Sequence, residues 1–167
     1  MNATWETRLT LGGLITCLPL CLMGCPDTDA AVFVELSIQN PTLEVETSVL
    51  ATAVSGSFDL RLHLGPRATD AAEVTLGSLS VTNHDQTITL IAPLAAVPNP
   101  AEPWIVNVDS DVDVSFTIDG LDNEVEVEAV DALCDPGGII ISGAFDDSLE
   151  DALKPVTSRV FHATGCP

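Results

Sequence analysis

Apolar and polar residues alternate along most of the chain after residue 31. The alternation runs through residues 32–39, resumes through residues 42–53 after Asn40 and Pro41, and returns in residues 58–64. Because consecutive side chains of a β-strand point to opposite faces, a period of two predicts a strand with one buried side and one solvent-facing side. We therefore predict three strands in this part of the chain.

The alternation changes phase at Gly77 in the next segment. Apolar residues occupy even-numbered positions before this glycine and odd-numbered positions after it, from Val74 to Val81. An extra residue in one strand moves the following side chains to the opposite face, which is the effect of a β-bulge. We predict a strand bulged at Gly77, a turn over residues 83–86 and another strand over residues 87–92.

The longest alternating segment, residues 104–118, follows a proline-rich connection. Its apolar residues form one face, which only Ser110 interrupts. The segment is much longer than a typical strand of about five or six residues. We therefore expect a bend or a change of sheet near residues 109–111.

A hairpin is expected to follow this segment. Residues 124–130 alternate again, and a loop over residues 120–123 would let them pair with the preceding strand. A register with Ile118 opposite Val125 would place both apolar faces on the same side. The pattern thus predicts a strand over residues 124–130.

A short helix is expected near the C-terminus, after a short apolar strand over residues 138–142. Asp147, with Glu150 three residues later, resembles a capping box at the start of a helix. We predict a helix over residues 148–154. Pro155 would end it, because proline interrupts the hydrogen bonding of a helix.

These elements favour an all-β protein over an α/β protein. Seven to nine short strands are separated by turn signals, with one or two helical turns among them. This pattern is typical of an antiparallel β-sandwich, for which an immunoglobulin-like arrangement is one candidate. We predict one domain over residues 32–167, with one short helix near its C-terminus.

The first 24 residues have the layout of a signal peptide. After Arg8, residues 9–24 contain no charged side chain. This segment includes Pro19 and is shorter than the ~20 apolar residues that a membrane-spanning helix needs. A signal peptide that is removed after export therefore fits better than a permanent span.

The end of this segment resembles the lipobox of bacterial lipoproteins: residues 22–25 are Leu, Met, Gly and Cys. The resemblance covers residues 1–25 only. It implies that residues 1–24 are removed and that Cys25 carries lipid on its sulfur, usually with a further acyl chain on its amine. Residues 25–31 would then form a short tether. The alternative is an ordinary secretory signal cut at another bond.

The domain is strongly acidic. Loss of residues 1–24 removes one acidic and one basic residue, so the net charge remains −20. The basic residues of residues 25–167 are Arg61, Arg67, Lys154 and Arg159. Four bases cannot neutralise a phosphate backbone, which dominates the affinity for nucleic acids, so we exclude DNA and RNA as partners.

Two cysteines are expected to form a disulfide. If Cys25 is lipidated, Cys134 and Cys166 are the remaining thiols of an exported chain, in a compartment that permits oxidation. A metal site is the weaker alternative, because these cysteines lack the Cys-x-x-Cys spacing of zinc ligands.

Three aspartates resemble the start of a calcium-binding loop. Asp109, Asp111 and Asp113 have its spacing, but Val114 stands where the loop needs glycine and Gly120 where it needs glutamate. The alternation with apolar residues indicates a solvated strand face instead. A looser calcium site, completed by an acid from a neighbouring loop, remains an alternative.

No catalytic motif accompanies the candidate acids and bases. His63, His84 and His162 do not occur in a G-x-S-x-G or H-E-x-x-H motif. The acidic pairs at residues 146–147 and 150–151 are explained by helix capping. We therefore predict that the protein is not an enzyme and needs no cofactor.

The sequence leads to one functional hypothesis and one alternative. The first is a lipid-anchored, non-catalytic β-sandwich with a structural or interaction role in the bacterial cell envelope. It would be held by Cys25, on the outer membrane rather than the inner one, and would have an envelope protein as a partner. The alternative is a surface adhesion module that binds calcium or another ligand.

Overall fold

The computed structural model describes residues 31–48 and 51–167. The predicted signal peptide and the predicted lipid attachment at Cys25 lie outside the described residues.

Ten strands, one 3-10 helix and one short α-helix make up the described part of the chain. They are β1 (Glu35–Thr47), β2 (Thr52–Leu64), β3 (Ala72–Asn83), β4 (Thr89–Ile91), β5 (Val97–Asn99), β6 (Trp104–Val106), β7 (Ser110–Ile118), η1 (Gly120–Asp122), β8 (Glu124–Val125), α1 (Val127–Leu133), β9 (Ile139–Asp147) and β10 (Glu150–Thr157).

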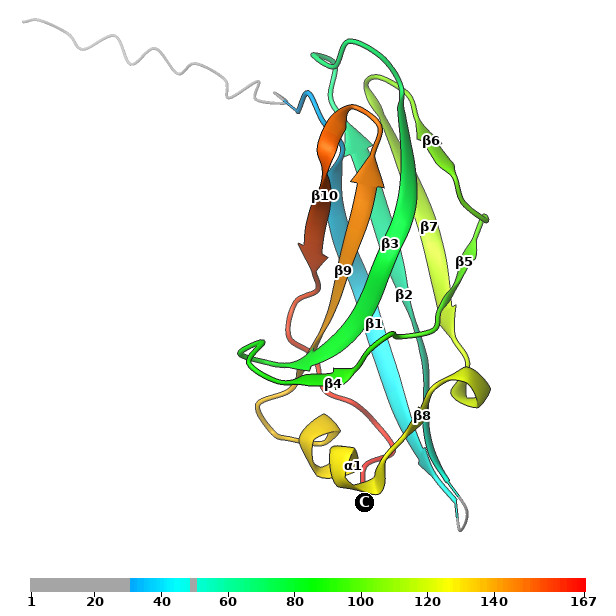
Figure 1. Ribbon diagram of the computed structural model, residues 1–167, viewed down its shortest axis with the longest axis vertical. Helices are drawn as coiled ribbons and strands as arrows, with labels where there is room; N and C mark the ends of the chain where they lie inside the picture. Colours follow the sequence, from blue (N-terminus) through cyan, green and yellow to red (C-terminus); the bar gives the residue numbers. More distant parts are fainter. Residues whose placement is uncertain (1–30, 49–50) are drawn as a thin grey trace, which may run out of the picture.

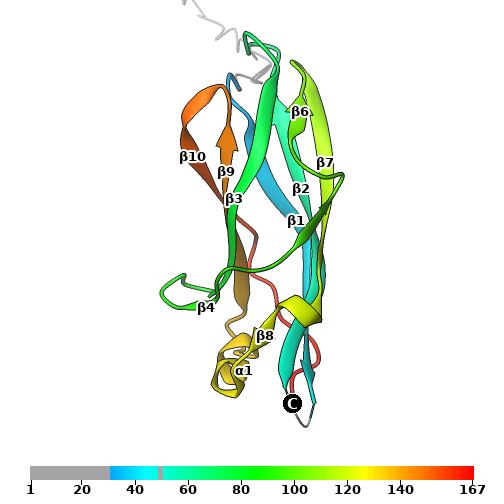
Figure 2. The same cartoon turned by 45° about the vertical axis from the view of Figure 1, so that its right-hand side comes forward.

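The strands form two antiparallel sheets that face each other (Figures 1 and 2). The first sheet has the order β1-β2-β7-β5, with β8 also paired to β2. The second has the order β10-β9-β3-β4, with β6 also paired to β3. The predicted fold class, an all-β antiparallel sandwich with one short helix, is confirmed.

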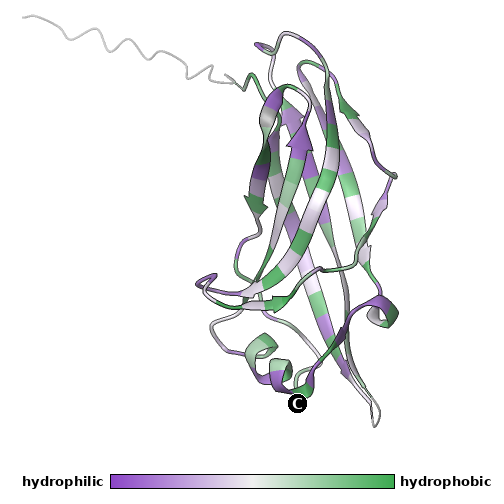
Figure 3. Cartoon of the chain, viewed as in Figure 1, coloured by the Kyte–Doolittle hydropathy of each residue, from purple (hydrophilic) through white to green (hydrophobic). Residues whose placement is uncertain are grey.

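An aromatic cluster joins the two sheets in the core. The rings of Phe58 and Phe116, on β2 and β7, are stacked with centroids 4.5 Å apart. Trp104 on β6 meets Phe116 edge-on at 5.8 Å and reaches Phe145 on β9 at 6.3 Å. Apolar and polar residues alternate along the longer strands, as Figure 3 shows, so strands such as β1, β2 and β7 contribute one face to this core.

The first two predicted strands are one continuous strand. β1 runs through Asn40, which has a positive φ of 49°, and its pairing with β2 shifts there between Gln39 and Thr42. The predicted strand over residues 42–53 was also too long, because β1 ends at Thr47 and residues 52–53 already belong to β2. Asn40 and Pro41 therefore mark a bulge rather than a chain reversal.

Two predicted irregularities are confirmed. The pairing of β3 with β9 shifts between Leu76 and Ser78, so the bulge lies at Gly77. The segment 104–118 changes sheet as expected: β6 pairs with β3, whereas β7 pairs with β2. Between them, Asp109 has a φ of 58°, a left-handed conformation that redirects the chain.

Residues 124–130 differ from the predicted strand. They contribute only β8 at their start and then enter α1, where Val130 and Leu133 are buried. These two residues are three positions apart, so a helix lets both face the core. The predicted hairpin with β7 is wrong too, because Val125 lies opposite Thr52 of β2. No helix in the described ranges is long and apolar enough to cross a membrane.

The helix predicted over residues 148–154 is also wrong. β9 and β10 form a hairpin there, in which Lys154 lies opposite Phe145. Asp147 is buried and does not cap a helix; Pro155 is tolerated because β10 is at the edge of its sheet. Long-range pairing outweighs the local capping signal.

Candidate functional site

The structure joins Cys134 and Cys166 by a disulfide, the pairing expected from the sequence. Their sulfur atoms are 2.07 Å apart. Cys134 ends α1, and Cys166 lies in the C-terminal tail, so the bond ties the tail to the helix. The two cysteines are therefore occupied with each other and not with a metal.

The aspartates on β7 face basic residues on β2. Asp111 accepts a hydrogen bond from Arg61 at 2.6 Å, and its other oxygen lies 2.8 Å from Nδ1 of His63. Asp113 pairs in register with Arg61. The hydrogen bonds from Arg61 and His63 hold the pKa of Asp111 below its ordinary value, and the same contact raises the pKa of Arg61.

This arrangement predicts a pH dependence for Asp111→Asn. A carboxyl whose pKa is lowered by folding stabilises the protein above its unfolded pKa, and this contribution disappears as the pH falls through the folded pKa. The melting temperature of Asp111→Asn should therefore lie slightly below that of the wild type at neutral pH. The difference should shrink as the pH falls below the unfolded pKa of aspartate and through the lower pKa of the folded carboxyl. Calorimetry over this range of acidic pH and at neutral pH measures it; a constant difference would contradict the prediction.

The three histidines lie in separate regions. His63 is on β2, His84 is in the turn between β3 and β4, where its ring is next to Gly137, and His162 is in the C-terminal tail. Across the ranges that the structure describes, no three His, Cys, Asp or Glu side chains are grouped in a way that could hold a metal ion.

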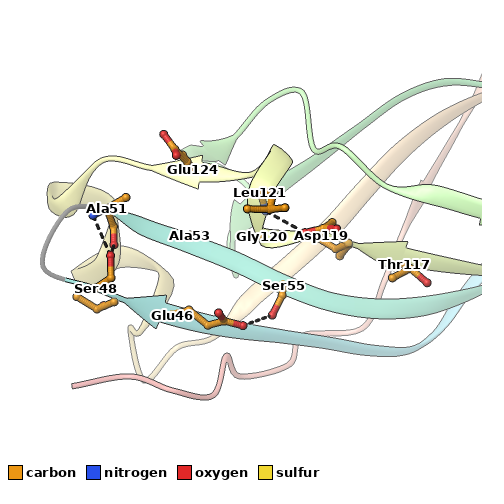
Figure 4. Close-up of a pocket in the computed structure, with 12 residues that line it drawn as sticks. Glu46, Ser48, Ala51, Ala53, Ser55, Thr117, Asp119, Gly120, Leu121 and Glu124 are labelled. Atoms are coloured by element: carbon orange, nitrogen blue, oxygen red, sulfur yellow. Dashed lines mark hydrogen bonds between the residues drawn. The ribbon is translucent and has the colours of Figure 1, made fainter.

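Two surface hollows, both lined partly by carboxylates, lie at the end of the sandwich that carries α1. A hollow of about 530 Å³, which we call the tip hollow, lies between the β1–β2 hairpin and η1 (Figure 4). Its walls include Ala51 and Ala53 on the hairpin side and Leu121 on η1. Leu121 is 87% exposed, the largest exposure among the large apolar residues of the described chain.

Three carboxylates from different elements line the tip hollow: Glu46 of β1, Glu124 of β8, and Asp119, which precedes η1. Glu46 accepts a hydrogen bond from the Ser55 hydroxyl at 2.8 Å. Asp119 accepts one from the Leu121 amide at 2.9 Å, which caps η1. Each of these two bonds leaves a second carboxylate oxygen for a ligand while orienting the side chain.

A second hollow of about 560 Å³ lies next to α1 and the C-terminal tail; we call it the tail hollow. Val127 and Val130 of α1 line it, together with Pro167. Glu128 and Asp131 also line it. The same end of the molecule therefore combines two open hollows with carboxylates.

The charge of this end is uncompensated. No lysine or arginine occurs between Arg67 and Lys154. The segment around η1, β8 and α1 carries seven acidic residues: Asp119, Asp122, Glu124, Glu126, Glu128, Asp131 and Asp135. The ion pairs found in the described residues involve Arg61 and His63, near the end of β2, and Lys154 on β10. None of these three bases belongs to the segment around η1, β8 and α1.

Asn123, between η1 and β8, is a buried residue that holds the segment next to the tip hollow in place. It is 3% exposed, donates hydrogen bonds to the carbonyls of Ala95 and Asp119, and accepts one from the Ala95 amide, all at 2.8 Å. Its own carbonyl accepts the Val54 amide of β2 at 3.0 Å. It thus joins the loop after β4 to η1 and β2.

Replacing Asn123 with alanine should lower the free energy of unfolding by about 2 kcal/mol, because buried backbone groups lose their partners. Chemical denaturation measures this loss. Thr117→Ala is the matched control: Thr117 is an exposed residue that lines the tip hollow, and its replacement should change stability by less than about 0.5 kcal/mol. Equal effects of the two substitutions would refute the role given to Asn123.

The sequence did not single out the tip hollow. The notable sequence signals were the aspartates on β7 and the cysteines, whereas Glu46, Asp119 and Glu124 are separated along the chain. They line one hollow because β1 and β7 both pair with β2, and because β8 also pairs with β2 instead of forming the expected hairpin with β7. The high density of acids from Asp119 onward was the one available signal.

Comparison with known proteins adds one distant likeness. No protein-family model and no curated protein matches the chain. A solved structure, the ASH/PapD-like domain of human CEP192 (PapD-like domain 7), is similar with 15% sequence identity and a TM-score of 0.34. The alignment covers 94% of this chain and 99% of that one.

Proposed function

We propose that this protein is a lipid-anchored, non-catalytic interaction module of the bacterial cell envelope. The observation that carries the proposal is the arrangement of the two ends of the sandwich. The described chain enters β1 at one end, whereas α1, the tip hollow and the tail hollow lie at the other (Figure 1). A chain anchored through Cys25 would hold the acidic end away from its membrane.

The short tether supports this orientation. Six residues separate Cys25 from Val32, which corresponds to a reach of roughly 20 Å at full extension. The first end would therefore stay close to the lipid surface. Because anionic lipid repels carboxylates, an acidic cluster at the far end is the favourable arrangement. We place the protein on the outer membrane, with an envelope protein as its partner.

A non-catalytic role agrees with the arrangement of the candidate acids and bases. The histidines are on separate elements, and Asp111 is bonded to Arg61 and His63. Asp147 is buried at the end of β9, where its carboxylate accepts a hydrogen bond from the Val34 amide. The calcium-binding alternative is weakened for the same reason, since both oxygens of Asp111 already have partners.

Intact mass spectrometry of the protein extracted from membranes tests the anchor. The expected mass is that of residues 25–167 plus acyl chains, and Cys25→Ala should lose both the lipid and the membrane association. Cys166→Ser is the control, because it removes a cysteine without touching the lipobox and should remain lipidated. An unlipidated wild-type protein in the soluble fraction would overturn the proposal.

A further inference from the structure

We propose that the tip hollow binds an extended segment of a partner protein in which lysine or arginine alternates with aliphatic residues. This inference deepens the proposed function by naming the chemistry of the partner. Leu121 is a large aliphatic side chain that is exposed to solvent at the rim of the hollow. Such a side chain gains free energy when a partner covers it.

The apolar surface of the hollow is small and bordered by charge. Ala51 and Ala53 offer methyl groups from β2 and its approach, and Leu121 stands opposite them on η1 (Figure 4). Glu46 and Glu124 flank this surface from β1 and β8. A ligand that fits must therefore bring an apolar group together with positive charge.

Two of the carboxylates are preorganised to bind a cationic group. Glu46 is held by Ser55, and Asp119 by the Leu121 amide, so binding costs them little side-chain freedom. None of the ion pairs within the described ranges involves Glu46, Asp119 or Glu124. A partner ammonium or guanidinium group would be the first base to compensate them.

Charge complementarity selects the occupant. A second copy of this chain, a nucleic acid and an anionic lipid headgroup all carry negative charge, so each would be repelled by this end of the molecule. A basic polypeptide is attracted, and it also supplies the apolar group that Leu121 requires. The open shape of the hollow at the end of the sandwich suits an exposed segment rather than an enclosed small molecule.

The test is a peptide titration with the full chain in uncharged detergent. The probe is the capped peptide Lys-Leu-Lys-Ala-Lys, with its glutamate counterpart Glu-Leu-Glu-Ala-Glu as the ligand control. The site variant is Glu46→Gln with Glu124→Gln. The matched control is Glu128→Gln with Asp131→Asn, which removes the same charge from the tail hollow at the same end. Titration calorimetry gives the affinities.

The lysine peptide should bind saturably and the glutamate peptide should not. The site variant should weaken binding about tenfold, and the matched control less than about threefold, because close charge pairs contribute more than distant ones. Leu121→Ser should weaken binding also, whereas a charge effect alone would leave it unchanged.

Several outcomes would overturn the inference: absence of binding, equal loss in the two double variants, or binding of a calcium ion at this hollow that the peptide does not displace. The anchor is tested separately. A protein without acyl chains that still binds the peptide through Glu46 and Glu124 would remove the lipid anchor and leave this inference standing. A lipidated protein that does not bind the peptide would support the lipid anchor and overturn this inference.

Discussion

Replacing Asp147 with alanine should destabilise the protein by about 3–5 kcal/mol, the range found when one partner of a buried ion pair is removed. Asp147 is 1% exposed and receives hydrogen bonds from the amides of Val34 at 2.9 Å and Leu149 at 3.0 Å. Nζ of Lys154 lies 3.4 Å from the same carboxylate and donates to the Val34 carbonyl at 2.9 Å. Three of these four contacts are made by the Asp147 carboxylate itself.

The loss should be large because alanine leaves several polar groups stranded at once. The Val34 and Leu149 amides would lose their acceptors, and the mostly buried ammonium group of Lys154 would lose a counter-charge. Lys154 also lies 5.0 Å from the centre of the Phe33 ring, so its displacement would loosen the segment that leads into β1. Hydrogen exchange at Val34 should accelerate together with the loss of stability.

Glu150→Gln is the matched control for Asp147→Ala. Glu150 is a partner of the same lysine, at 2.8 Å, but its side chain is 36% exposed. Exposed ion pairs contribute about 0–1 kcal/mol, so this variant should unfold within about 1 kcal/mol of the wild type. Denaturant titrations with unchanged slope compare the two. A loss below about 1 kcal/mol in Asp147→Ala would mean that water replaces the carboxylate and that the hairpin is held elsewhere.

Alternation of apolar and polar residues was enough to predict most of the strands, because every strand of a sandwich buries one face. It also located the bulge at Gly77 and the change of sheet before β7, since both alter the phase or the continuity of the pattern. Even the exposed aspartates of β7 were predicted to face solvent. These features depend on local sequence alone.

The failures have a common cause in contacts between distant segments. Around Val130, alternating valines favoured a strand, but residues three apart serve a helix equally well, and the core at this end is closed by α1. The capping signal at Asp147 was chemically sound, yet Val34, far away along the chain, uses that carboxylate. The residues near Asp147 in the sequence do not indicate that Val34 is its partner. The tip hollow was unpredictable for the same reason, because its three carboxylates come from separate elements.

Removal of the disulfide by Cys134→Ser with Cys166→Ser should destabilise the protein by about 4 kcal/mol, on the chain-entropy relation for a bridge of this span. The two cysteines are 32 positions apart. Urea unfolding of the double variant and of the wild type, each with and without reductant, measures the effect. Reductant should shift the wild type toward the variant and leave the variant unchanged.

The loss of stability should be greatest in the C-terminal tail, because the tail contacts both sheets immediately before the disulfide. Phe161 pairs with Ile139 at the start of β9, while Thr164 exchanges backbone hydrogen bonds with Leu43 and Val45 of β1, at 2.9 and 2.8 Å. The tail therefore covers the edge of the first sheet, and an uncovered edge is a site for pairing with other chains. Faster hydrogen exchange at Val45 and concentration-dependent association should accompany the loss of the disulfide. Unchanged protection at Val45 would instead show that the tail stays in place through its own contacts, so that the bond acts on the unfolded chain alone.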